Sequence, residues 1–191
     1  MSEEAIAHLR ADPDLGSLVE EHGEVILDPA DSLFERMIRS VVSQQVSTAA
    51  ATSIRENLYD AVEITPQGVL AADEATLRDA GLSGQKVGYV RNIAEAFGEN
   101  RYSVAYFEEM SNDEVVDELS SITGVGTWTG KMQLMFGLGR PDVFPVEDLG
   151  IRNGMQVLYG DDLTRAEMTE LAEPWRPYRS YASLYLWRSV D

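Results

Sequence analysis

Apolar residues recur every three or four positions through most of the chain, which is the spacing of amphipathic helices. Alternating patterns that would indicate strands are scarce, and only residues 25–27 could form an extended link. The sequence therefore predicts an all-α fold. The clearest helical face comprises Leu33, Phe34, Met37, Ile38, Val41 and Val42.

Capping residues and glycines set the expected ends of the helices. Thr164 and Glu167 have the spacing of a capping box, and Pro66 suits the first turn of a short helix after Thr65. Gly81 and Gly98 are expected to end the helices that precede them. Besides the helix after Asp31 or Ser32, the expected helices are 2–11, 14–21, 48–61, 74–80, 85–97, 102–109, 111–120, one from 127, 148–159, 164–173 and a last one ending at 190.

The composition narrows the classes of protein that the chain could be. With 191 residues, 44% of them hydrophobic, it can bury a core. It has no apolar run of membrane length and no signal-peptide pattern, so we expect a soluble, cytoplasmic protein. Zero cysteines and two histidines argue against disulfides, thiolate metal sites and zinc.

The net charge of −18 argues at first sight against nucleic acid as a partner. Lys86 and Lys131 are the only lysines, and so acidic a chain with so little lysine is typical of adaptation to molar salt. At about 1 M salt charges are screened over roughly 3 Å, so the global repulsion of DNA would largely disappear. Two interpretations follow: a halophilic DNA-binding protein, or an acidic protein that does not touch DNA.

Residues 119–148 hold the most informative motif, LSSITGVGTWTGKMQLMFGLGRPDVFPVED. Gly124 and Gly126 would allow a tight hairpin between two helices, and the second helix, from Thr127, would present free N–H groups to an anion such as phosphate. An ordinary helix-turn-helix corner remains the alternative for this fragment alone. A Gly- and Pro-rich loop then leads to the acidic pair Glu147 and Asp148.

This stretch resembles the helix-hairpin-helix–Gly/Pro/Asp superfamily of DNA glycosylases. Gly124-Val125-Gly126 matches the hairpin and 137–145 the Gly/Pro loop, while Trp128-Thr129 and 142–145 resemble the 3-methyladenine DNA glycosylase II branch. Residues 34–50 and 175–187 resemble the early helix with its Gln-rich turn and the last helix, so the resemblance spans roughly 30 to 190. It implies one catalytic unit of two helical lobes, 30–110 and 1–30 with 145–191, joined by 111–148, with the active-site cleft between them.

The resemblance assigns Asp148 as the catalytic carboxylate, although Asp is also a common helix N-cap. Glu147 is a secondary candidate. The base pocket would include Trp128, Trp187, Met132 and Leu149, and core packing is the alternative for both tryptophans. Bifunctional relatives carry a Schiff-base lysine at the position of Trp128, and Lys131 would face elsewhere on the helix. A monofunctional enzyme is therefore expected.

The same resemblance implies the DNA contacts. Gly124, Val125, Gly126 and Thr129 would hold phosphate through the backbone, and Gln45 would enter the duplex unless it is simply a polar turn residue. No cofactor is expected to be required. Arg152 would either stabilise the region of Asp148 or meet DNA. Main-chain carbonyls at Ser120, Ile122 and Val125 would hold a structural sodium or potassium ion.

The function expected is excision of alkylated purines, of the 3-methyladenine type, from damaged double-stranded DNA by base flipping and N-glycosidic hydrolysis in base excision repair. The alternatives are the same fold acting on oxidised or mismatched bases, and a catalytically silent module for binding DNA or a protein. A monomer without a membrane or a known protein partner is expected.

Overall fold

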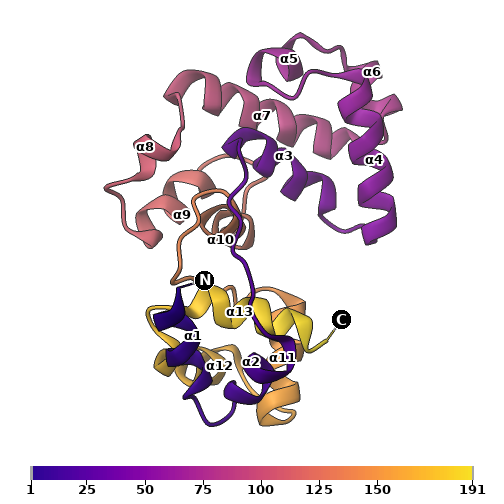
Figure 1. The fold of residues 1–191 in the computed structure, drawn as a ribbon. Coiled ribbons are helices and arrows are strands. Elements are labelled where there is room, and N and C mark those ends of the chain that lie inside the picture. The colour runs from indigo at the N-terminus through magenta and orange to yellow at the C-terminus, as the bar shows by residue number, and fades with distance from the viewer. Residues whose placement is uncertain (1, 191) are drawn as a thin grey trace. The chain divides into compact units, whose positions relative to one another are not determined.

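The computed structural model describes residues 2–190, and every regular element in that range is a helix (Figure 1). The prediction of an all-α fold is thus confirmed, and Val25 to Leu27 form no strand. The chain divides into two compact units. The central unit is Ala30–Gln133, and the terminal unit combines the residues up to Pro29 with those from Leu134 onward. None of the described helices is long and apolar enough to cross a membrane.

The central unit is built around its longest helix, α7, which packs against α3 and α5 (Figure 1). Met37 and Ile38 of α3 and Ile93 of α7 are fully buried. The start of α10 also belongs to this unit. Its helices are α3 (Leu33–Ser43), α4 (Thr48–Ala61), α5 (Pro66–Ala71), α6 (Glu74–Asp79), α7 (Gly84–Asn100), α8 (Val104–Phe107), α9 (Asn112–Ser120) and α10 (Thr127–Phe136).

The terminal unit joins the two ends of the chain in one hydrophobic core. Trp175 and Tyr185 are fully buried in it, and the Tyr185 hydroxyl donates to the Gly23 carbonyl at 2.8 Å. Its last helix, α13, packs against both α2 and α11. Its elements are α1 (Glu3–Arg10), α2 (Gly16–His22), α11 (Leu149–Tyr159), α12 (Arg165–Leu171), the 3₁₀ turn η1 (Glu173–Trp175) and α13 (Arg179–Arg188).

The predicted helix starts are largely confirmed. Ser47 caps α4, which has the predicted bounds, and Thr65 caps α5 with Pro66 in its first turn. The capping box of Thr164 and Glu167 is present. Side-chain caps act within three residues of the helix start, so they can be recognised from sequence.

Several predicted helix ends differ from the structure by two residues or more, and the last helix ends at Arg188 and not at Val190. Gly98 does not end α7, which runs on to Asn100, and Arg101 instead takes the left-handed conformation with φ +54°. Gly98 does not take the left-handed φ of a helix-ending glycine, and the Arg101 amide donates to the Phe97 carbonyl at 3.1 Å. The helix predicted over 102–109 is reduced to α8. The helix predicted to end near Glu173 stops at Leu171, before η1.

Candidate active site and hairpin

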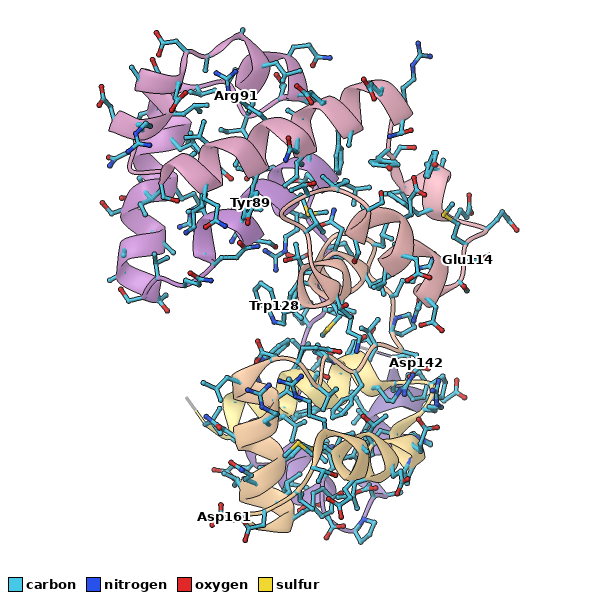
Figure 2. The ribbon with its side chains drawn as sticks, turned by 180° about the vertical axis from the view of Figure 1, so that it is seen from behind. Tyr89, Arg91, Glu114, Trp128, Asp142 and Asp161 are labelled. Atoms are coloured by element: carbon cyan, nitrogen blue, oxygen red, sulfur yellow. The ribbon has the colours of Figure 1, made fainter. Side chains whose placement is uncertain are left out.

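The hairpin in the central unit requires glycine at position 124. Gly124 has φ +105°, and a Cβ built there would lie 2.3 Å from Cγ of Tyr89 on α7 (Figure 2 labels Tyr89). The preceding turn is closed by the Val125 amide, which donates to the Ile122 carbonyl at 3.0 Å. The hairpin backbone therefore lies directly against an aromatic ring, with no space for a side chain at Gly124.

Position 126 differs from position 124 because a Cβ at Gly126 would meet nothing within 4 Å. The Gly126 carbonyl accepts the first hydrogen bond of α10, from the Gly130 amide at 3.0 Å. Gly126 is thus the N-cap, and glycine has no side chain with which to cap the first amides of the helix. Gly126 is also exposed to solvent. The first turn of α10 is consequently suited to receive an anion.

The turn between α3 and α4 is tied to this hairpin by Gln44. Its Nε2 donates to the Gly124 carbonyl at 3.3 Å and lies 3.5 Å from Oγ1 of Thr129. Gln45, by contrast, is exposed and takes a left-handed φ of +57°. Thr129 as a whole is only 2% exposed, and its predicted contact with DNA stays a prediction.

A surface pocket of about 310 Å³ lies between that turn, the start of α7 and the hairpin. Lys86 is its only basic residue, and its Nζ donates to the Val42 carbonyl at 2.7 Å. Burial lowers the pKa of Lys86. Positive charge in the pocket is therefore limited to one amine that already has a partner. The lining residues are Gln44, Gln45, Ser83, Gln85, Lys86, Tyr89, Gly124, Val125 and Gly126.

Asp148 is the N-cap of α11 in the terminal unit, as its local sequence allowed. Its Oδ1 accepts from the Ile151 amide at 3.1 Å and from the indole Nε1 of Trp187 at 2.8 Å. The capping role of Asp148 is thus observed, and its catalytic role stays a prediction. The Trp187 ring also lies against Phe136, with centroids 5.9 Å apart.

The other residues predicted for the base pocket differ in exposure. Trp128 lies half-buried in the first turn of α10 (Figure 2), and Met132 of the same helix is only 3% exposed. Leu149, beside Asp148, is 62% exposed. Their part in a base pocket stays a prediction.

The Gly/Pro loop before Asp148 is held by contacts that sequence reasoning missed. Asp142 forms a two-pronged ion pair with Arg179 of α13, with N–O distances of 2.6 and 3.2 Å (Asp142 is labelled in Figure 2). Ser180 Oγ accepts from the Val143 amide at 2.9 Å and donates to the Arg140 carbonyl at 2.6 Å. The only signal in the sequence was that Asp142 and Arg179 carry opposite charges.

The structure favours one of the two roles left open for Arg152. Its guanidinium NH1 donates to the carbonyls of Glu147 at 2.5 Å and Val146 at 3.3 Å. Arg152 therefore stabilises the backbone of the two residues immediately before Asp148.

Comparison with known proteins identifies the class that this fold and site define. The model of the HhH-GPD superfamily of base excision DNA repair proteins matches residues 38–177, and the chain belongs to this family. DNA-3-methyladenine glycosylase 1 of Schizosaccharomyces pombe is 34% identical over 164 residues, which are 82% of this chain and 72% of that protein.

Two solved structures are also similar. The S. pombe 3-methyladenine DNA glycosylase in complex with abasic DNA has a TM-score of 0.89 and 31% identity, over 97% of this chain and 96% of that one. A DNA-3-methyladenine glycosidase from Bacillus halodurans has a TM-score of 0.87 and 31% identity, over 100% and 90%. These similarities confirm the resemblance to 3-methyladenine DNA glycosylases.

Proposed function

We propose that this protein is a monofunctional DNA glycosylase that excises alkylated purines, of the 3-methyladenine type, from duplex DNA in base excision repair. The observation that carries the proposal is the Asp148 carboxylate, held at the start of α11 by a backbone amide and an indole N–H. Support comes from relatives named 3-methyladenine DNA glycosylases, one of which was solved with abasic DNA.

Asp148 would act on the sugar. As the bond from C1′ to the base nitrogen breaks, positive charge develops on the sugar, and the base leaves with the bonding electron pair. An ionised carboxylate beside C1′ stabilises that charge and orients the water that adds to C1′. An alkylated purine already carries positive charge and leaves as a neutral base, so little acid assistance is needed.

Trp128 supports a glycosylase that leaves an abasic site without cutting the strand. A lysine at this position would be required for Schiff-base chemistry, and Lys131 lies almost one turn further along α10. Strand nicking measured without alkali tests this point. We expect no nicking above background, and nicking that disappears in Lys131→Ala would contradict it.

The hairpin would hold the DNA backbone through the amides of Gly126 and the first turn of α10. Arginine and lysine contacts to phosphate lose affinity steeply with salt, because they release counterions, whereas neutral amides release few. Phosphate binding by backbone amides is compatible with a chain of net charge −18 and supports our proposal that the protein works in molar salt.

The target base must leave the duplex, at a cost of a few kcal/mol. Stacking on aromatic rings offsets this cost by about 1–3 kcal/mol per base, and Trp128 and Trp187 are our candidates for such stacking. Met132 and Leu149 are our further candidates for contact with the base. The exposed, left-handed Gln45 projects from its turn and is our candidate for insertion into the gap.

We also propose a structural sodium or potassium ion at the end of α9. That helix ends at Ser120, so its last carbonyls present the negative end of the helix dipole at the turn of Ile122 and Val125. Ser120 Oγ is buried and has no hydrogen-bond partner within residues 2–190. The Ile122 carbonyl already accepts from the Val125 amide but retains a second lone pair. The ion would supply positive charge beside a bound phosphate.

The deciding experiment measures base release from alkylated duplex DNA in molar KCl by the wild type and by Asp148→Asn. Asparagine is also a good N-cap, so the variant should fold normally. Release of 3-methyladenine by the wild type alone would support the proposal. Without release at any salt concentration, but with duplex binding intact, oxidised or mismatched bases or a silent binding module would become the better reading. All proposed site residues lie on one chain, so we further propose that a monomer is active.

A further inference from the structure

We propose that Trp187 is a positioning residue, which holds the Asp148 carboxylate in its reactive orientation, and that Gly150 provides the space for this contact. The inference rests on the proposed function of Asp148. It gives Trp187 a role that stacking on a flipped base does not include.

The geometry of the carboxylate carries the first step. Two donors reach the same oxygen, Oδ1 of Asp148: the Ile151 amide from its own helix and the Trp187 indole from α13. A charge-assisted hydrogen bond of 2.8 Å from a rigid indole strongly restricts rotation of the carboxylate. The Ile151 amide belongs to the same short segment as Asp148, so the indole of α13 is the donor that fixes the carboxylate relative to another helix.

Gly150 carries the second step. A Cβ there would lie 2.7 Å from Cδ1 and 3.0 Å from Nε1 of Trp187, and 3.1 Å from Oδ1 of Asp148. Gly150 lies in the first turn of α11 and has no left-handed φ, so backbone conformation does not require glycine there. Glycine inside a helix costs about 1 kcal/mol relative to alanine. Glycine at position 150 leaves space for the hydrogen bond between Trp187 and Asp148, and this offsets its cost to the helix.

The packing of α11 against α13 carries the third step. One turn beyond Gly150, a Cβ on Gly154 would lie 2.7 Å from the Leu186 carbonyl, so the two helices approach closely there as well. Tyr185 and Leu186, beside Trp187, are fully buried. The backbone at Trp187 is therefore held in place, and its indole N–H has a fixed position from which to donate to Asp148.

Trp187→Phe removes the N–H group but keeps an aromatic ring. We expect kcat for excision to fall by about 10- to 100-fold with little change in KM, because the carboxylate loses its orientation while base stacking persists. Trp175→Phe is the matched control. Its buried Nε1 has no hydrogen-bond partner within the described residues, so its loss should leave kcat unchanged.

Gly150→Ala tests the same contact without removing either partner. We expect a loss of kcat similar to that of Trp187→Phe, and no further loss when the two changes are combined. Gly88→Ala is the control, because it adds a Cβ to a helical glycine with nothing within 4 Å. Additive losses in the double variant would contradict a shared mechanism.

Two duplexes that carry no base at the target site separate positioning from stacking. One has a cationic pyrrolidine in place of the sugar and the other has a neutral tetrahydrofuran. Trp187→Phe should weaken binding of the cationic duplex about tenfold and leave the neutral one unchanged, because only the cation resembles the charge that Asp148 stabilises. An equal effect on both duplexes, or none on either, would overturn the proposal.

A spectroscopic measurement keeps this test apart from the proposed function. The chain has three tryptophans, so it gives three indole N–H signals in a ¹⁵N-labelled sample, and Trp187→Phe identifies one of them. Asp148→Ala should shift that signal without substrate present. An unmoved signal refutes the positioning contact even in an active enzyme. A shifted signal in a protein that excises no base supports the contact and refutes the function.

Discussion

Gly124→Ala should destabilise the central unit by about 2–6 kcal/mol, and two separate costs add up to this range. A Cβ at this position would lie 2.3 Å from Cγ, 2.4 Å from Cδ1 and 2.7 Å from Cβ of Tyr89, and overpacking of this kind costs about 1–3 kcal/mol. A φ of +105° adds about 1–3 kcal/mol for a residue with a side chain. The sum is a large part of the roughly 5–15 kcal/mol by which a domain is stable.

Chemical denaturation of the wild type, Gly124→Ala and Gly126→Ala measures this effect. Gly126→Ala is the internal control, because its Cβ meets nothing within 4 Å and its stability should change by less than about 1 kcal/mol. Adding Tyr89→Ala to Gly124→Ala removes the contacts at 2.3 and 2.4 Å but keeps the one with Cβ at 2.7 Å, so it should recover only part of the packing cost. A Gly124→Ala protein as stable as the wild type, or two alanine variants equally destabilised, would refute the reasoning. Gly126→Ala should instead weaken duplex binding, since its Cβ would stand where phosphate approaches the amides.

Three further predictions concern stability and salt. Asp142→Ala should cost about 3 kcal/mol in urea unfolding, because it leaves Arg179, whose side chain is only 10% exposed, with Glu173 alone; an unchanged midpoint would contradict this. Hydrogen bonds with Thr164 lower the pKa of Glu167 in the folded state. This group therefore stabilises the fold above its unfolded pKa and ceases to do so as pH falls through the lower folded pKa. Glu167→Gln keeps the capping box, so its Tm should fall less than that of the wild type as pH falls between these two pKa values. The logarithm of duplex affinity should fall with the logarithm of KCl concentration with a slope shallower than about −2, and a slope near −5 would indicate that side-chain cations dominate the grip.

The helices could be predicted largely because the signals that start them are local. Ser47 and Thr164 each cap a helix through the amide three residues on, and both starts were predicted. The end of α7 could not be predicted in this way. Gly98 has no left-handed φ, and the residue that takes this conformation is Arg101, whose type gives no such signal.

In the candidate site, too, local motifs could be predicted from the sequence but contacts between distant residues could not. The position of Asp148 and the glycines of the hairpin were predicted from a family motif, whereas the hydrogen bond of Asp148 to Trp187 joins residues 39 positions apart. The hydrogen-bond partners of Arg152 could not be predicted from the sequence either, because a guanidinium next to an acidic pair could equally reach a carbonyl, a carboxylate or DNA.

One helix, α13, contacts both the Gly/Pro loop and the proposed catalytic carboxylate of the terminal unit. Its first turn holds the Gly/Pro loop through Arg179 and Ser180, and its last turn holds Asp148 through Trp187. Arg152 of α11 closes the arrangement by binding the carbonyls just before Asp148. A carboxylate that must face a short-lived cation gains most when its orientation is set before the substrate arrives, since no reorganisation is then needed in the transition state. Changes along α13 should therefore affect the rate of bond cleavage more than the affinity for DNA.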